Sequence, residues 1–315
     1  MNNACITGVS GYLGWKLAER LVEHADLDII LGIDVVEPKA SLKGLKFRKA
    51  DIRDPDIGGL FRRNSIDTVF HLAFVVKPIH DLRLMFDIDY NGTRNILEKA
   101  YEAGVKRMVA ISSTLAYGAH KDNPPRLKED APLRGNRNFP YAFHKAIVDR
   151  LVQRFATEHP QMVITTLRPC TILGPGVNNY VSRMLFMPVV LSVSGYNPHV
   201  QLLHERDFIE ACLVASDMEM KGVFNIAGHG TLRVSDIASM TGARPIPVPP
   251  CILYPLLEFM WRIHMPGIEV NSAYLDYVRY PFVADTSKAR DFLGFQPAYS
   301  SIDTLKETIR SRKDA

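Results

Sequence analysis

The fold is decided by the stretch Ile6-Thr-Gly-Val-Ser-Gly-Tyr-Leu-Gly14. It contains the end of a short apolar β-type run, Ala4–Thr7, and opens an amphipathic helical pattern. The glycines Gly8, Gly11 and Gly14 allow a tight turn and let the backbone approach a phosphate closely. The N-terminus of the following helix adds free N–H groups and the positive end of the helix dipole. The stretch therefore predicts a dinucleotide site, although its G-x-x-G-x-x-G spacing differs from the G-x-G-x-x-G fingerprint and such glycines can be purely structural.

Asp34 ends the second β-type run, twenty residues after Gly14. A carboxylate at this place can accept hydrogen bonds from the ribose hydroxyls of adenosine and would repel a 2′-phosphate. This favours NAD over NADP, although the nearby Lys39 keeps NADP open and a strand-end Asp can also simply cap a turn. Asp51 and Ile52 follow the third β-type run, where a side chain could meet the adenine amino group.

Strand-type and helix-type runs alternate through the first half of the chain. The expected strands are Ala4–Thr7, Ile29–Asp34, Leu45–Lys49, Thr68–Leu72, Met108–Ser112 and Val163–Leu167, and the expected helices are Tyr12–His24, Pro55–Asn64, Leu84–Ala103 and Tyr141–Glu158. This alternation predicts an α/β fold, a Rossmann-type doubly wound parallel sheet. Beyond Arg168 the chain is rich in Pro and Gly, which indicates a smaller, irregular α+β C-terminal substrate domain. We expect residues 1–169 plus about 200–227 in the NAD-binding domain, and about 170–199 plus 228–315 in the substrate-binding domain.

Composition excludes several classes of protein. The 315 residues are 47% hydrophobic and 23% charged, which is ordinary globular composition. The net charge of +4 is spread without a Lys/Arg block, so we expect no nucleic-acid partner. The four cysteines lie far apart, which predicts neither a metal site nor a disulfide framework and favours the cytoplasm. We expect no signal peptide and no transmembrane segment, because no apolar run reaches the length of a span.

Tyr141 and Lys145 stand four residues apart in Pro140-Tyr-Ala-Phe-His-Lys145, at the head of a helical pattern. At this spacing both side chains leave one helix face, one turn apart. An ammonium beside a phenol favours the phenolate, which makes the pair a candidate proton-transfer base. Alone the pair is a weak signal, because Tyr and Lys meet at this spacing in many helices.

An ordered set of motifs strengthens this interpretation. In chain order they are Gly8-x-x-Gly11-x-x-Gly14, Asp34, Asp51-Ile52, His71-Leu-Ala-Phe74, Asn91-Gly-Thr-Arg-Asn95, Ser112-Ser-Thr-Leu-Ala-Tyr-Gly118, Tyr141-x-x-x-Lys145, Arg168-Pro169, Gly174-Pro175-Gly176, His204-x-x-Asp207, Phe224-Asn-Ile-Ala227 and Leu293-Gly-Phe-x-Pro297. The set resembles the extended short-chain dehydrogenases/reductases, the NAD-dependent epimerase/dehydratase family that includes UDP-glucose 4-epimerases. The resemblance covers nearly the whole chain.

The resemblance implies a catalytic triad of Ser113, Tyr141 and Lys145. In this triad Ser113 hydrogen-bonds the reacting oxygen of the substrate and Tyr141 takes or returns its proton. Lys145 binds the nicotinamide ribose and stabilises the phenolate. The cofactor-binding residues implied in the same way are Gly8, Gly11, Tyr12, Leu13, Gly14, Asp34, Asp51, Ile52, Leu72, Ala73, Phe74, Asn91, Ser112, Tyr141, Lys145, Pro169 and Cys170. The expected substrate contacts are Val75, Ser113, Thr114, Tyr141 and Thr171.

Two departures from the family narrow the reaction and the substrate. The 4,6-dehydratases carry an Asp-Glu pair directly after the catalytic Thr, where this chain has Thr114 and Leu115, so dehydration is disfavoured. The nucleotide-sugar 4-epimerases carry an Asn that reaches the diphosphate and an Arg before the His-Val-x-Asp motif, where this chain has Thr171 and Val200. Arg183, Arg206 and Arg279 are the candidates to replace these contacts.

The segment 251–265 is apolar nearly all round. We expect it to be a core helix of the smaller domain, and two alternatives are the wall of an apolar substrate pocket and a helix on a membrane surface.

The predicted function is an NAD-dependent epimerase of a nucleotide sugar, similar to the UDP-hexose 4-epimerases. Tyr141 would serve as the acid and base of a transient oxidation to a ketone. The first alternative is an NAD(P)-dependent dehydrogenase or ketone reductase acting on a less polar, sterol-, flavonoid- or lipid-like alcohol. The second is a non-catalytic NAD-sensing protein. The family resemblance also implies a homodimer, formed through the helix near Leu84–Ala103 and the Tyr141 helix.

Overall fold

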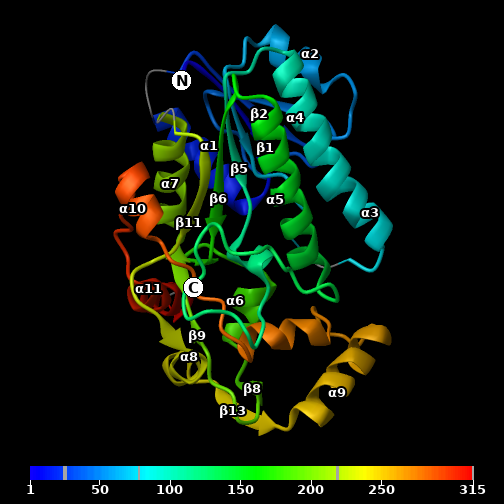
Figure 1. Ribbon diagram of the computed structural model, residues 1–315, viewed down its shortest axis with the longest axis vertical. Coiled ribbons are helices and arrows are strands. Elements are labelled where there is room, and N and C mark those ends of the chain that lie inside the picture. Colours follow the sequence, from blue (N-terminus) through cyan, green and yellow to red (C-terminus); the bar gives the residue numbers. More distant parts are fainter. Residues whose placement is uncertain (24–26, 77–78, 218–219, 314–315) are drawn as a thin grey trace.

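The computed structural model describes residues 1–23, 27–76, 79–217 and 220–313, so the predicted helix end at His24 lies outside the described residues. A seven-stranded parallel sheet forms the larger part of the molecule, in the order β11-β6-β5-β4-β1-β2-β3. Its strands are β1 (Asn3–Thr7), β2 (Ile29–Asp34), β3 (Leu45–Lys49), β4 (Thr68–His71), β5 (Arg107–Ile111), β6 (Val163–Pro169) and β11 (Gly222–Ile226). Figure 1 shows this sheet above a smaller lobe.

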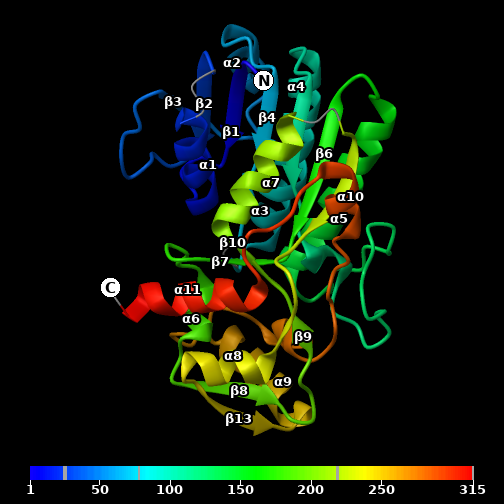
Figure 2. The ribbon, with the colours of Figure 1, turned by 90° about the vertical axis from the view of Figure 1, so that its left-hand side faces the viewer.

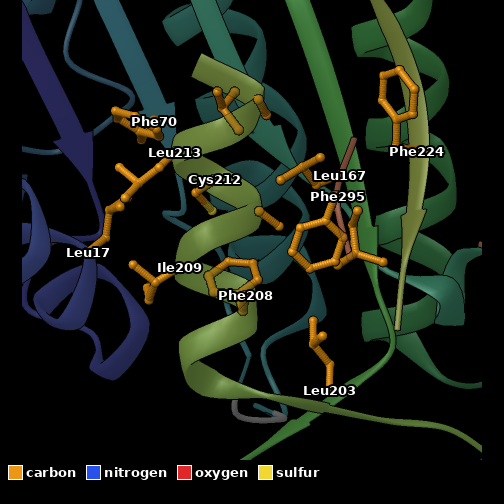
Figure 3. Close-up of a cluster of buried hydrophobic side chains, with 14 of the residues drawn as sticks. Leu17, Phe70, Leu167, Leu203, Phe208, Ile209, Cys212, Leu213, Phe224 and Phe295 are labelled. Atoms are coloured by element: carbon orange, nitrogen blue, oxygen red, sulfur yellow. The ribbon is translucent and has the colours of Figure 1, made fainter. Parts of the chain in front are cut away.

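Helices cover both faces of the sheet because successive side chains of each buried strand point to opposite faces. Ala4 and Ile6 of β1 pack toward α1 (Tyr12–Glu23) and α7 (Glu205–Asp217). Cys5 packs on the other face, which is covered by α2 (Ile57–Arg63), α4 (Thr93–Glu102) and α5 (Pro140–Glu158). In Figure 3, Phe208, Ile209 and Cys212 of α7 project into the first of these cores beside Leu17. The predicted doubly wound fold is confirmed.

The strand order reverses at β1, which pairs with β2 on one side and β4 on the other. Loops leaving two such neighbouring strands turn to opposite faces, so a crevice opens at the carboxyl ends of the strands. That edge carries Thr7, Asp34, His71, Ile111 and Pro169. The fold therefore brings the predicted glycine loop, Asp34 and the segment around Ser113 to one place.

The long helix predicted as Leu84–Ala103 is a composite. It runs without a break through α3 (Leu82–Phe86), a π-helical segment η1 (Asp87–Gly92) and α4. A π-helical turn adds a residue and rotates the side chains that follow.

The smaller lobe consists of short elements below the carboxyl edge of the sheet, as Figure 2 shows in side view. Its strand pairs are β7 (Thr171–Leu173) with β10 (Leu202–His204), β8 (Val189–Val193) with β13 (Arg244–Val248), and β9 (His199–Val200) with β12 (Leu232–Arg233). Its helical elements are α6 (Tyr180–Leu185), α8 (Val234–Thr241), α9 (Pro250–Arg262), η3 (Ser272–Val278) and α11 (Ser301–Lys313). Two further elements, η2 (Thr114–Tyr117) and α10 (Ser287–Leu293), lie beside the sheet. The chain returns to the sheet through α7 and β11, and the predicted domain boundaries stay a prediction.

The expectation of a core helix at residues 251–265 is wrong. Of the residues in α9, only Leu253 is buried, so the all-round apolar pattern does not mark a buried helix. None of the helices in the described part of the chain combines the length and the apolarity needed to cross a membrane.

Candidate active site

The glycine loop adopts the tight turn that its sequence predicts. Gly8 has a positive φ of 75°, and a Cβ at this position would lie 2.8 Å from the backbone of Ala73. A Cβ at Gly14 would lie 2.2 Å from the carbonyl oxygen of Gly8. Glycine is therefore required at both positions, so that the loop can pack against the start of α1 and the segment after β4.

A cavity of about 1110 Å³ extends from this loop into the smaller lobe. Nearly all the predicted cofactor residues line it, namely Gly8, Gly11, Tyr12, Leu13, Gly14, Asp34, Asp51, Ile52, Leu72, Ala73, Phe74, Ser112, Tyr141, Lys145, Pro169 and Cys170. The predicted substrate residues Val75, Ser113, Tyr141 and Thr171 also line it. We divide the cavity into two halves. The cofactor half lies along the glycine loop and the carboxyl ends of the strands, and the lobe half is lined by residues of the smaller lobe.

Two predicted site residues do not reach the cavity wall. The Asn91 side chain donates to Asp87 Oδ1 at 2.7 Å, one turn back along the π-helical segment. Thr114 is fully buried at the start of η2, while its neighbours Ser113 and Leu115 form the wall. Asn91 and Thr114 are thus set back from the cavity in this structure, and their roles as cofactor and substrate contacts stay predictions.

The two acidic residues of the cofactor half have backbone or side-chain partners. Asp34 accepts hydrogen bonds from the N–H groups of Ser10 at 3.0 Å and Val36 at 3.1 Å, so it does cap a turn. A carboxylate has about four acceptor positions, which leaves capacity for ribose hydroxyls. Asp51 is held by Arg53, with an Nη2–Oδ2 distance of 2.6 Å, and this contact lowers the pKa of Asp51.

Tyr141 and Ser113 meet where the two halves of the cavity join. The Ser113 hydroxyl accepts a hydrogen bond from the N–H of Leu115 at 3.2 Å, and it lies near enough to the Tyr141 phenol to lower the pKa of that group. Burial raises the pKa of Tyr141 above its ordinary value, the Ser113 contact lowers it, and the negative charge of Asp89 raises it further. The phenol is therefore held protonated in the protein alone.

Lys145 lies beneath Tyr141 on the same face of α5. Its ammonium donates to the carbonyl oxygen of Ile111 at 2.7 Å and sits 3.6 Å from the centre of the Phe74 ring. The ammonium is 5.8 Å from the centre of the Tyr141 ring, so the predicted one-turn spacing is present. Burial lowers the pKa of Lys145 to about 8, against the raising effect of Asp89 and Asp149.

A sequence profile of the NAD dependent epimerase/dehydratase family matches residues 4–227. The chain belongs to this family. Family membership confirms the predicted resemblance and NAD as the cofactor. It does not distinguish epimerase from dehydratase activity, because the family includes both.

Similar proteins agree with this assignment. An uncharacterised protein of Mycobacterium tuberculosis is 28% identical over 98% of this chain and 83% of its own length. A UDP-glucuronate 4-epimerase of Thermodesulfobacterium geofontis is 26% identical over 98% of this chain and 95% of its own. The solved structure of the Thermus thermophilus UDP-glucose 4-epimerase in complex with NAD has a TM-score of 0.76 at 19% identity, with 99% of both chains covered.

Within this family fold, a buried ion pair supports the segment around Ser113. The guanidinium of Arg168 contacts the Asp149 carboxylate twice, at 2.7 and 2.9 Å, and the side chains are 1% and 0% exposed. Ser112 donates to the same carboxylate at 2.5 Å, and Arg168 also donates to the Tyr117 hydroxyl at 2.7 Å. A bidentate, fully hydrogen-bonded pair of this kind fixes its neighbours. It therefore holds the end of β5 against α5 and β6.

Asp89 and His144 form a second buried pair that the sequence did not indicate. Asp89 Oδ2 lies 2.9 Å from His144 Nδ1, and Asp89 Oδ1 accepts from the N–H of Val75 at 2.8 Å. Burial raises the pKa of Asp89, and the contact with His144 lowers it. His144 stands next to Lys145 in α5, so the pair links η1, the segment after β4 and α5.

The lobe half of the cavity is strongly apolar. Its wall includes Met184, Val190, Ile237, Leu253, Leu257 and Val278. Among the described residues that line the whole cavity, only Arg53 and Lys145 carry a positive charge, and both belong to the cofactor half.

Arg183, Arg206 and Arg279, the three candidates for substitute diphosphate contacts, are not themselves residues of the cavity wall, whereas Glu269, the partner of Arg183, is. Arg183 pairs with Glu269. Arg206 donates to the Tyr299 hydroxyl at 3.2 Å. Arg279 donates to the Tyr196 hydroxyl at 2.9 Å and lies over the Tyr196 and Tyr280 rings. In this arrangement the lobe half offers no cation to a substrate from the part of the chain that is described.

Proposed function

We propose that this chain is an NAD-linked oxidoreductase that interconverts a hydrophobic secondary alcohol and its ketone. The observation that carries the proposal is the position of Ser113 and Tyr141 on the cavity wall, between the cofactor half and a lobe half whose described lining residues are mostly apolar and include no cation. A nucleoside diphosphate buried there would keep its negative charges without partners, at a large desolvation cost. An apolar alcohol would be stabilised by the same wall.

The residues of the chain have separate parts in this reaction. NAD, held along the glycine loop and Asp34, accepts or returns hydride when bound. Ser113 hydrogen-bonds the reacting oxygen and fixes its distance to Tyr141. Tyr141 takes the proton of the alcohol or returns it to the ketone. The apolar lobe excludes water, which strengthens these interactions.

To act as a base near neutral pH, the Tyr141 phenol needs a pKa well below its ordinary value. Bringing its pKa from about 10 to about 7 requires on the order of 4 kcal/mol. Burial raises the pKa of Tyr141, so a nearby positive charge must lower that pKa by more than burial raises it. The Lys145 ammonium, held by Ile111 and Phe74, supplies that charge from below the ring.

A second candidate is an NAD-dependent epimerase of a nucleotide sugar, of the UDP-hexose 4-epimerase type. It is favoured by the relatives, because those with a named activity include UDP-sugar 4-epimerases. The same triad would serve a transient oxidation of the sugar. We disfavour the 4,6-dehydratase reaction, although relatives of that class exist, because Thr114 is buried and Leu115 cannot act as an acid or base.

A substrate panel separates the two candidates. Purified protein is incubated with NAD and either UDP-hexoses or apolar secondary alcohols such as sterols, and NADH formation and epimer formation are both measured. We expect NADH with an apolar alcohol and no epimer from any UDP-hexose. Epimer formation without net NADH would establish the second candidate, and no reaction in either arm, with NAD bound, would favour the NAD-sensing alternative.

We also propose that the chain forms a homodimer in which α5 and the composite α3–η1–α4 helix pack against their copies. We propose the cytoplasm as its location. Sedimentation velocity of the purified chain tests the dimer.

A further inference from the structure

Helix α9 presents an apolar surface to the outside of the smaller lobe. Ile252, Leu256, Phe259 and Ile263 are exposed and follow one another at intervals of four, three and four residues. This spacing places them on one side of the helix, and we call them the α9 face. In Figure 1, α9 and the β8–β13 ribbon form the end of the molecule farthest from the sheet. Ile246 of that ribbon is exposed as well.

The other side of α9 lines the substrate cavity. Leu253 and Leu257 contribute to the wall of the lobe half, as do Val189 and Leu191 from β8. Helix α9 thus lies between an apolar cavity and an apolar outer surface. An exposed apolar face of a helix can mark a binding surface, and because the same helix lines the cavity, we expect a partner with the same apolar chemistry as the cavity's occupant.

The charges around the α9 face suit an anionic lipid surface. Between residues 243 and 268 the cations are Arg244 and Arg262, both exposed. The acid in this stretch is Glu258, whose carboxylate accepts from Arg262 at 3.0 Å and from Ser272 at 2.9 Å. Amphipathic helices with Lys or Arg at the edge of an apolar face lie in the interfacial region of bilayers.

Trp261 does not belong to this face. Its ring stacks on His80 with 4.3 Å between ring centres, which ties α9 to the segment before α3. The contact keeps α9 attached to the rim of the cofactor half while its outer face stays exposed.

We propose that the α9 face docks on the surface of a lipid bilayer and that the lobe half takes its substrate from that bilayer. The docking rests on the surface alone, whereas the delivery of substrate rests on the proposed function. The substrate class is then an alcohol or ketone that partitions into membranes. A second copy of this chain on the same face is the competing occupant.

Vesicle co-sedimentation tests the docking. The full-length protein is mixed with phosphatidylcholine vesicles, with and without phosphatidylglycerol, and compared with an Ile252→Glu/Phe259→Glu double variant. Phe292→Glu is the matched control, because Phe292 of α10 is 58% exposed and Phe259 is 60% exposed. We expect the wild type and Phe292→Glu to sediment with vesicles, more strongly with phosphatidylglycerol, and the double variant to lose at least 10-fold in partitioning, about 1.4 kcal/mol.

Three results would overturn the proposal. The first is a wild type that stays in the supernatant at every lipid concentration. The second is a Phe292→Glu variant that loses vesicle binding as strongly as the double variant. The third is a wild-type oligomer in sedimentation velocity that the double variant dissociates, which would assign the face to a second copy. A wild type that does not bind vesicles but turns over an apolar alcohol with NAD would remove the docking alone, so its failure is distinguishable from failure of the proposed function.

Discussion

Asp89 lies against His144 of α5 inside the protein, with 2.9 Å between Oδ2 and Nδ1. Its charge raises the pKa of both Tyr141 and Lys145. Asp89 is therefore a positioning residue that also sets the charge balance of the site without touching the cavity.

Asp89→Asn should shift the pH dependence of the reaction. Removing the negative charge lowers the pKa of Tyr141, so alcohol oxidation should reach half its maximal rate at a lower pH than in the wild type. Asparagine keeps an acceptor for the Val75 N–H, so the fold should persist. The pH profile of kcat/KM measures the shift, and Asp291→Asn on remote α10 is the control. An unchanged profile in a folded Asp89→Asn protein would refute the assigned role.

Asn91 is expected from its place in the family motif, whereas the buried pair of Asp89 with His144 has no signal in the sequence. The partner of Asp89 is also 55 residues away in sequence, so no local pattern could indicate the contact. The glycine loop and the strands were predictable because their signals are local and periodic. The position of α9 was not, because an all-round apolar helix suits a core and an interface equally well.

Breaking the buried Arg168–Asp149 pair should be costly. Asp149→Asn leaves the guanidinium without its charge partner, and such losses typically cost about 3–5 kcal/mol. Chemical denaturation of the variant should show this decrease in the free energy of unfolding. Glu98→Gln, which removes the exposed partner of Arg94, should have no measurable effect. Equal stability of the two variants would contradict a structural role for the buried pair.

Lys145 should make the stability of the protein depend on pH. Its pKa is about 8 in the native state against 10.5 for the free group. Between these values the unfolded chain binds more protons, so this residue makes the free energy of unfolding rise with pH. This lowering of the Lys145 pKa corresponds to a change of about 3 kcal/mol in the free energy of unfolding.

Lys145→Met should therefore be inactive yet more stable than the wild type at pH 7, by up to about 3 kcal/mol. The difference should shrink between pH 8 and 10.5. Denaturation of both proteins across this range measures it, and the comparison cancels the contribution of the buried cysteines Cys5, Cys170 and Cys212. A difference that does not vary with pH would mean that Lys145 is not desolvated.

Gly14 and Gly11 of the glycine loop differ in how closely an added Cβ would approach the backbone. A Cβ at Gly14 would lie 2.2 Å from the Gly8 carbonyl oxygen, whereas a Cβ at Gly11 would lie 3.2 Å from the same atom. Gly14→Ala should therefore weaken NAD binding by roughly 100-fold or more, about 2.7 kcal/mol. Gly11→Ala should be the milder change. Calorimetric titration with NAD ranks the two variants, and the reverse order would contradict the loop geometry.

The most direct test of the proposed chemistry is single-turnover hydride transfer in Tyr141→Phe. Enzyme saturated with NAD is mixed with the alcohol found active in the substrate panel, and NADH formation is followed. Phenylalanine keeps the ring that packs edge-on against Phe74 but has no proton to exchange. We predict unchanged NAD affinity and hydride transfer slower by about 10²–10⁴-fold. Transfer at the wild-type rate would contradict Tyr141 as the acid and base.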